Sequence, residues 1–181
     1  MSARIGEGDD NYNTGIISAF NDKAGEAGIK VDMPVIKAAK RMLIAKNTFK
    51  QSAGPFVMHE DLGGRIILTD TIAYLTDGER RSVVVGGSHC AHTTYEFVKD
   101  LELKGIFLND AGKGKDNAGI SGLHLFQEAS IPAGAIDCMT AMIGNSRDAW
   151  ENGIISAVNR TAQTHGIAIG MPIQKAALKL L

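Results

Sequence analysis

Side chains that could do chemistry follow three short apolar segments of the chain. They form three pairs of neighbouring polar or titratable residues, namely Ser88 and His89, Asn109 and Asp110, and Asp137 and Cys138. Ligands of open α/β sheets bind in the crevice beyond the carboxyl ends of the parallel strands. We therefore expect the three pairs to meet at one edge of a sheet and to form a site for a small molecule.

Four of these residues are candidates for catalysis: Ser88, His89, Asp110 and Cys138. Ser88 follows two glycines, as the serine of a nucleophile elbow does, although Cys90 replaces the second glycine of that motif, and Ser88 could equally cap a helix. His89 could move protons near neutral pH while Asp110 orients it or braces a loop. Cys138 could be a nucleophile or an inert thiol. The start of the expected helix would lower the pKa of Cys90.

A weak metal signal overlaps with these candidates. His89 and His92 are three residues apart at the start of the expected helix, so they could share a face and hold a divalent metal with Asp110. They could equally pack against the neighbouring loop. We predict no cofactor.

A glycine-rich segment with two lysines follows Asp110. Free N–H groups before a helix could cradle a carboxylate or a single phosphate, or the segment could be a solvated loop. Its glycine spacing fits neither a Walker loop nor the dinucleotide fingerprint. The predicted substrate-binding set is Gly87, Asn109, Gly112, Lys113, Gly114, Lys115 and Asn117.

The two ends of the chain carry a sequence repeat. Residues 3–43 (the N-terminal unit) match residues 141–181 (the C-terminal unit) at an offset of 138, with 19 identities in 41 positions. The two units could flank a central sheet or mediate self-association. Alternatively, the N-terminal unit is the end of a lost or neighbouring module. Asn21 and Asn159 are equivalent polar residues within an otherwise apolar pattern. Their side chains could form hydrogen bonds with the backbone of another layer.

Each unit is predicted to contain two helices. In the N-terminal unit, apolar residues at helical spacing predict a helix over residues 10–27, Gly28 suits a left-handed C-terminal cap, and Pro34 opens the second helix. The equivalents in the C-terminal unit are residues 148–165, Gly166 and Pro172.

Between the units, residues 54–140 alternate between strand and helix patterns. Strand-helix-strand order with short connections predicts parallel strands covered by helices on both faces. We predict one α/β domain over residues 1–181, a three-layer sandwich with a mixed sheet that has parallel core strands and an antiparallel edge, flanked by two homologous helical units. The predicted strands are Phe56–Met58, Arg65–Leu68 and Ile72–Leu75 at the edge, then Ser82–Val85, Gly105–Leu108 and Pro132–Ile136; the predicted helices span residues 88–103 and 118–129.

Composition narrows the function classes. The chain has 19 Lys and Arg against 20 Asp and Glu, and a formal net charge of −1, so it lacks the basic stripe of a nucleic-acid binder. It has no apolar leader and no span-length apolar stretch, so we expect a cytoplasmic protein that does not enter a membrane. Because the repeated units could mediate self-association, we also expect a homo-oligomer. We expect a small-molecule metabolic enzyme that performs hydrolysis or acid–base chemistry on a compact anionic substrate. The alternative is a non-catalytic metabolite-binding or assembly subunit that uses the same crevice.

Overall fold

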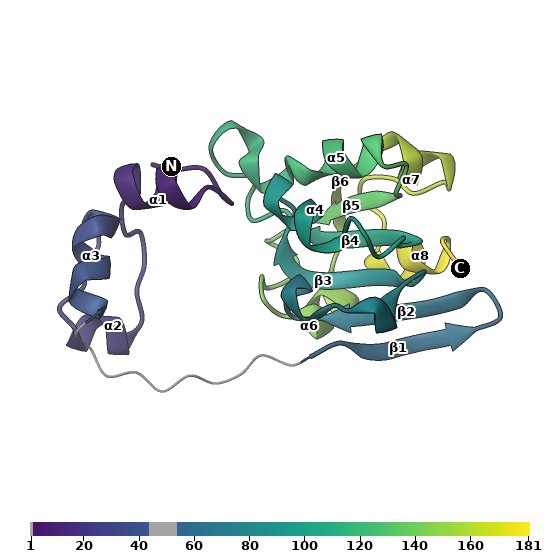
Figure 1. The fold of residues 1–181 in the computed structure, drawn as a ribbon, viewed down its shortest axis with the longest axis horizontal. Helices are drawn as coiled ribbons and strands as arrows, with labels where there is room; N and C mark the ends of the chain where they lie inside the picture. The colour runs from purple at the N-terminus through teal and green to yellow at the C-terminus, as the bar shows by residue number, and fades with distance from the viewer. Residues whose placement is uncertain (1, 44–53) are drawn as a thin grey trace.

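The computed structural model describes residues 2–43 and 54–181. Its centre is a six-stranded mixed sheet in which the strands lie in their order along the chain (Figure 1). Neighbouring strands from β2 to β5 are parallel, and β1 and β6 pair antiparallel at the two edges. The strands are β1 (Phe56–Asp61), β2 (Gly64–Thr69), β3 (Val83–His89), β4 (Gly105–Asn109), β5 (Ala133–Ile136) and β6 (Ile155–Val158). The predicted α/β class and mixed sheet are confirmed.

Helices cover both faces of this sheet. Side chains alternate between the faces of a strand, so Val84 packs with Phe126 on the side of α4 and α5, whereas Val83 and Val85 pack with Ala176 on the side of α6 and α8. The helices of the described residues are α1 (Gly8–Thr14), α2 (Asp22–Glu26), α3 (Val35–Met42), α4 (His92–Val98), α5 (Gly122–Glu128), α6 (Ser146–Asn152), α7 (Arg160–Thr164) and α8 (Ile173–Leu178), with short 3-10 helices η1 (Ile72–Tyr74), η2 (Asp77–Glu79) and η3 (Lys115–Ile120). None of these helices is long and apolar enough to cross a bilayer.

The predicted turn after Val85 is wrong, because β3 continues to His89. Gly86 and Gly87 lie within the strand, where close neighbours leave no room for a side chain. A Cβ on Gly86 would lie 2.7 Å from the Leu108 side chain, and one on Gly87 would lie 2.7 Å from backbone atoms of the loop before α6. The predicted strand over Ile72–Leu75 is also wrong. That segment forms η1, which begins where the Thr71 hydroxyl accepts the Ala73 N–H.

The helix predicted over residues 148–165 is interrupted by β6. Helix α6 ends at Asn152, and Gly153 continues in an extended conformation. Residues Ile155–Val158 then pair with β5, and the Asn159 side chain caps α7 by accepting the Ala162 N–H. The antiparallel pairing with β5 outweighs the helical spacing of the apolar residues here, because it satisfies the backbone groups of both strands.

The helix predicted over residues 10–27 is interrupted in a similar way. Helix α1 ends at Thr14, Ile16 forms an isolated bridge with Pro34, and Asn21 caps α2. The predicted left-handed glycines are confirmed, with φ of +79° at Gly28 and +71° at Gly166. The predicted starts of the second helices are confirmed too, since α3 and α8 each follow a proline.

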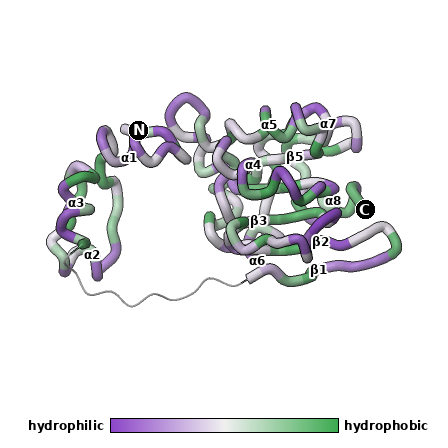
Figure 2. Tube along the Cα trace, viewed as in Figure 1, coloured by the Kyte–Doolittle hydropathy of each residue, from purple (hydrophilic) through white to green (hydrophobic). Residues whose placement is uncertain are grey.

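The N-terminal unit lies beside the sheet domain rather than on a face of the sheet (Figure 1). Its own small core consists of Ile29, Met33 and Ala38. Figure 2 shows apolar residues along β2 and β3, where helices cover them, and also along α3. The C-terminal unit, by contrast, supplies α6, β6 and α8 to the sheet domain.

Candidate functional site

The three polar pairs lie at the carboxyl ends of the neighbouring strands β3, β4 and β5. Ser88 and His89 end β3, and His89 is in register with Asn109, which ends β4. Asp110 follows Asn109, while Asp137 and Cys138 follow β5. Side-chain contacts divide these residues into two groups. One group centres on Asp110 and faces β6, and the other centres on His89 and faces α4.

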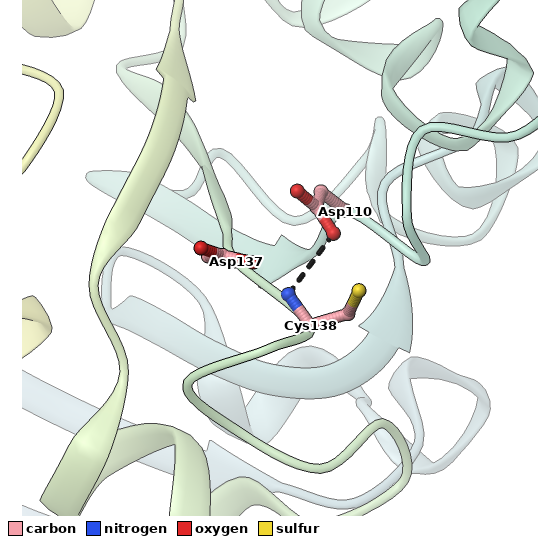
Figure 3. Close-up of side chains that lie close together, drawn as sticks. All are labelled: Asp110, Asp137 and Cys138. Carbon is pink, nitrogen blue, oxygen red and sulfur yellow. Dashed lines mark hydrogen bonds between the residues drawn. The ribbon is translucent and has the colours of Figure 1, made fainter.

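Asp110 holds the first group together. Its Oδ1 accepts the N–H groups of Gly112 (2.9 Å) and Cys138 (3.0 Å), and its Oδ2 accepts the Ser156 hydroxyl of β6 (2.8 Å). Figure 3 shows the bond to the Cys138 backbone. Burial would raise the pKa of Asp110, but the hydrogen bonds from Gly112, Ser156 and Cys138 lower it. The ionised carboxylate therefore ties the ends of β4, β5 and β6 together.

Cys138 is a protonated thiol in this arrangement. Burial, its hydrogen bond to Asp110 and the charges of Asp110 and Asp137 all raise its pKa. A thiol that keeps its proton is a weak nucleophile. The other cysteine, Cys90, is buried among the side chains under α4 and α5, and burial raises its pKa to about 12. The expected lowering at Cys90 is wrong, because α4 begins only at His92 and Cys90 packs into the core.

Asp110, Asp137 and Cys138 are the one group of three potential metal-ligating side chains that the described residues bring together, with ligand atoms within 4.8 Å of one another. This set differs from the predicted His89, His92 and Asp110. In Figure 3 the Asp137 carboxylate and the Cys138 sulfur point in different directions. The Asp110 oxygens already accept three hydrogen bonds, and Asp137 Oδ1 accepts the N–H of the second residue after it.

Ser88 and His89 line a pocket of about 170 Å³. The Ser88 hydroxyl accepts the Ile72 N–H (3.1 Å), so its own proton remains to donate to a ligand. Ser88 does not cap the helix that follows it, because it lies within β3 and Ala91 precedes α4. The residues around the pocket are Thr71, Ile72, Ala73, Ser88, His89, Thr93, Thr94 and Phe97.

His89, which lines this pocket, has a neutral ring. Burial lowers its pKa, as does the charge of His92, although a backbone hydrogen bond of His89 opposes the change. Its Nδ1 accepts the Ala91 N–H (3.3 Å), which leaves the proton of the neutral ring on Nε2. No hydrogen bond in the described structure joins His89 to Asp110.

The loop after Asp110 is unusually rich in left-handed backbone. Six of its residues have positive φ: Ala111, Gly112, Lys113, Gly114, Asp116 and Asn117. Much of the predicted anion cradle serves the protein itself. Gly112 donates its N–H to Asp110, Lys113 donates its N–H to the Asp110 carbonyl, and Gly114 packs against Ile5. Arg4 forms an ion pair with Asp116 (2.9 Å).

The remaining predicted binding residues also hold neighbouring segments. The Asn109 side chain accepts the Ala111 N–H (2.8 Å) and donates to the Ala141 carbonyl (3.0 Å). The carbonyl of Gly87 accepts the Gly144 N–H (2.8 Å).

Two parts of the site were missed by sequence reasoning. Ser156 lies in β6, which was predicted as helix, and its occurrence at the same place in both units was the available signal. The threonines around the pocket carry no motif. No family model, no curated protein and no solved structure matches the chain.

Proposed function

We propose that the chain is a small-molecule enzyme that binds a compact anionic substrate in the pocket of Ser88 and His89 and performs an acid–base or hydrolytic step there. The observation that carries this proposal is that Ser88 and His89, consecutive residues that each carry a hydrogen-bond donor, line one pocket. Two such donors suit an oxygen of a carboxylate, a carbonyl or a phosphate.

In this proposal the neutral His89 ring donates a hydrogen bond from Nε2 to the substrate oxygen as negative charge develops on it, and in hydrolysis the proton lost by the attacking water leaves with the departing group. A lowered pKa keeps the ring neutral near pH 7, so it stabilises the developing charge by a hydrogen bond and keeps its own proton. A pocket of about 170 Å³ suits a compact substrate. Asp110 is a positioning residue in this proposal. Its oxygens accept hydrogen bonds from Gly112, Cys138 and Ser156 and so hold the ends of the strands in place.

A second candidate is a non-catalytic metabolite-binding subunit that uses the same pocket. The state of the other polar residues favours it. Cys138 keeps its proton, and Asp110 has no hydrogen bond to His89 in the described structure, so these candidate residues include neither an activated thiol nor a histidine paired with a carboxylate. Binding without turnover is the property that separates this candidate from the enzyme.

Acetyl phosphate is a suitable test compound, because it is a compact anion with a hydrolysable bond. We expect it to shift the amide resonances of Ser88, His89 and Thr93 and to be hydrolysed by the wild-type chain. His89→Asn should lower the rate about 100-fold. His124→Asn is the matched control, since His124 is exposed on α5 and pairs with Glu128.

The outcomes separate the candidates. Shifts at the pocket with no hydrolysis of acetyl phosphate, and none of p-nitrophenyl acetate, would establish binding alone. Absence of shifts with acetyl phosphate, acetate and inorganic phosphate would refute both candidates. Hydrolysis at equal rates in the two histidine variants would refute the catalytic role of His89.

A further inference from the structure

The C-terminal unit shows which of its positions face the sheet. Its buried side chains belong to the same core as Val83, Val85 and Phe107 of β3 and β4. These sheet-facing residues, including the partly buried ones, are Ala141, Ala149, Trp150, Ile155, Val158, Ala162, Ile167, Met171, Ile173, Ala176, Ala177, Leu180 and Leu181.

The N-terminal unit forms the same internal backbone hydrogen bonds at the offset of 138. In each unit a bridge joins the extended segment to the proline before the last helix, Ile16 with Pro34 and Ile154 with Pro172. In the N-terminal unit, the backbone N–H groups of Ile17, Val35 and Ile29 donate to the carbonyls of Met33 (2.9 Å), Gly15 (2.9 Å) and Ala24 (3.0 Å), respectively. In the C-terminal unit, the equivalent N–H groups of Ile155, Ile173 and Ile167 donate to the carbonyls of Met171 (3.0 Å), Gly153 (2.9 Å) and Ala162 (3.2 Å). Equivalent positions of the two units can therefore be compared directly.

The N-terminal unit keeps an apolar residue at nearly all the sheet-facing positions. Asn11 is the one polar replacement among the thirteen. Several of these apolar side chains face no sheet. Phe20 and Met42 are each 45% exposed, whereas Leu180, the equivalent of Met42, is 8% exposed. The thirteen equivalents are Ala3, Asn11, Tyr12, Ile17, Phe20, Ala24, Ile29, Met33, Val35, Ala38, Ala39, Met42 and Leu43.

Two polar residues of the C-terminal unit recognise the sheet. Ser156 donates its hydroxyl to Asp110, and the Asn159 side chain accepts the Ala133 N–H (3.1 Å) and donates to the Ile131 carbonyl (2.8 Å) at the start of β5. These bonds fix the register of β6 on β5 as well as satisfying buried groups.

The N-terminal unit keeps both recognition residues, as Ser18 and Asn21. Both are exposed, and Asn21 makes only the local bond from the Ala24 N–H (3.0 Å). A local cap explains Asn21 in part, because the asparagine oxygen alone is needed for it. The local cap does not explain Ser18, which lies on an exposed extended segment near Phe20.

We propose that the N-terminal unit is a docking element for a separate α/β sheet of the same architecture as residues 54–140. Residues 17–20 would pair antiparallel with an uncovered edge strand equivalent to β5. Ser18 would donate to an aspartate at the position of Asp110, and Asn21 would bond the start of the edge strand.

The sheet of this chain is not the partner, because its own C-terminal unit covers β5 and bonds Asp110. A second copy of the chain carries the same cover on its sheet. The partner is therefore a sheet that lacks its own C-terminal unit, and complementation by a strand is a known mode of such recognition.

A chimera of the full-length chain tests the proposal. Residues 141–181 are replaced by the sequence of residues 3–43, which has the same length, and amide exchange of β5 is measured by mass spectrometry. We expect β5 to exchange within about tenfold of the wild-type rate, because the transplanted residues cover it in the same register. Asn21→Ala in the transplanted copy should speed that exchange tenfold or more.

In the chimera, Phe20 takes the place of the smaller Val158 and could fail to fit the core. A second, repacked chimera therefore keeps the test decisive. It carries Phe20→Val and Met42→Leu in the transplanted copy, which restores two residues of the C-terminal unit. Unprotected β5 in both chimeras would overturn the proposal.

Light scattering of the wild-type chain tests the identity of the partner. A monomer agrees with a separate sheet, whereas a dimer abolished by Phe20→Asp would show that a second copy covers this face.

Discussion

The two terminal units place related sequences, with 19 identities in 41 positions, in two surroundings. Residues 141–181 share a large core with the sheet, and Ile155, Ala162, Ile173 and Ala176 are almost completely buried. Residues 3–43 have a core of only three buried side chains. Both units nevertheless form the same bridges and asparagine caps. Local sequence is therefore sufficient for the backbone pattern of the unit, while the sheet determines how much apolar surface is buried.

The largest difference between the units is expected at the isoleucine of the extended segment. Ile155→Ala should lower the free energy of unfolding of the sheet domain by about 3 kcal/mol, because it leaves a cavity in the shared core. Ile17→Ala should change the same transition by less than about 0.5 kcal/mol. Fluorescence of Trp150, the one tryptophan of the chain, reports this transition during urea unfolding. Equal effects of the two substitutions would mean that both units belong to one cooperative core.

A somewhat smaller difference is expected at the capping asparagines. Asn159→Ala removes a cap and leaves the Ala133 N–H and the Ile131 carbonyl without partners, so we expect a loss of about 2 kcal/mol in the Trp150 transition. Asn21→Ala removes a cap from an exposed helix and should leave this transition unchanged. Asn159→Asp keeps the cap and loses the amide donor, so it separates the two contributions. An Asn159→Ala variant with an unchanged free energy of unfolding would contradict the recognition role given to Asn159.

The smallest difference concerns the serines and depends on pH. Ser156→Ala should cost about 1 kcal/mol, and Ser18→Ala nothing, because only Ser156 donates to a carboxylate. The folded-state pKa of Asp110 is lowered. Its stabilising contribution is therefore complete above the unfolded pKa of about 3.9 and is lost as the pH falls through the folded value. Urea unfolding at pH 6 and pH 3 should show a larger loss in the wild-type chain than in Asp110→Asn, where only the other carboxyl groups with lowered pKa values, such as Asp148, still contribute. An identical pH dependence in both would place the titrating group elsewhere.

The central strands were predictable because each is a continuous apolar run closed by glycine, proline or polar residues. Strand β6 was not, since Ile154, Ile155, Val158 and Ala162 also fit helical spacing. What distinguishes the two structures is the pairing with β5, which lies outside the local sequence. The end of β3 was misplaced for a related reason. Gly86 and Gly87 suggested a turn, whereas in the structure they lie within β3 and let neighbouring segments of the protein pack closely against the strand.

The site shows the same division between local and distant information. Residues after parallel strands could be expected at one edge of the sheet, and they lie there. Their partners could not be predicted. Asp110 bonds Ser156 of β6, and His89 accepts a hydrogen bond from Ala91 two residues later. The first contact needs the missed strand, and the second needs β3 to extend as far as His89.

The sequential strand order has a consequence for synthesis of the chain. Strand β5 is made before β6, and at 5–20 residues per second the C-terminal unit needs about 2–8 s to follow it. Throughout this interval the nascent sheet has an open edge at Ala133–Ile136, which is a template for wrong pairing. The N-terminal unit has already been made by then and carries the equivalent strand segment. Translation speed across residues 141–181 therefore sets how long the nascent chain is exposed to mispairing.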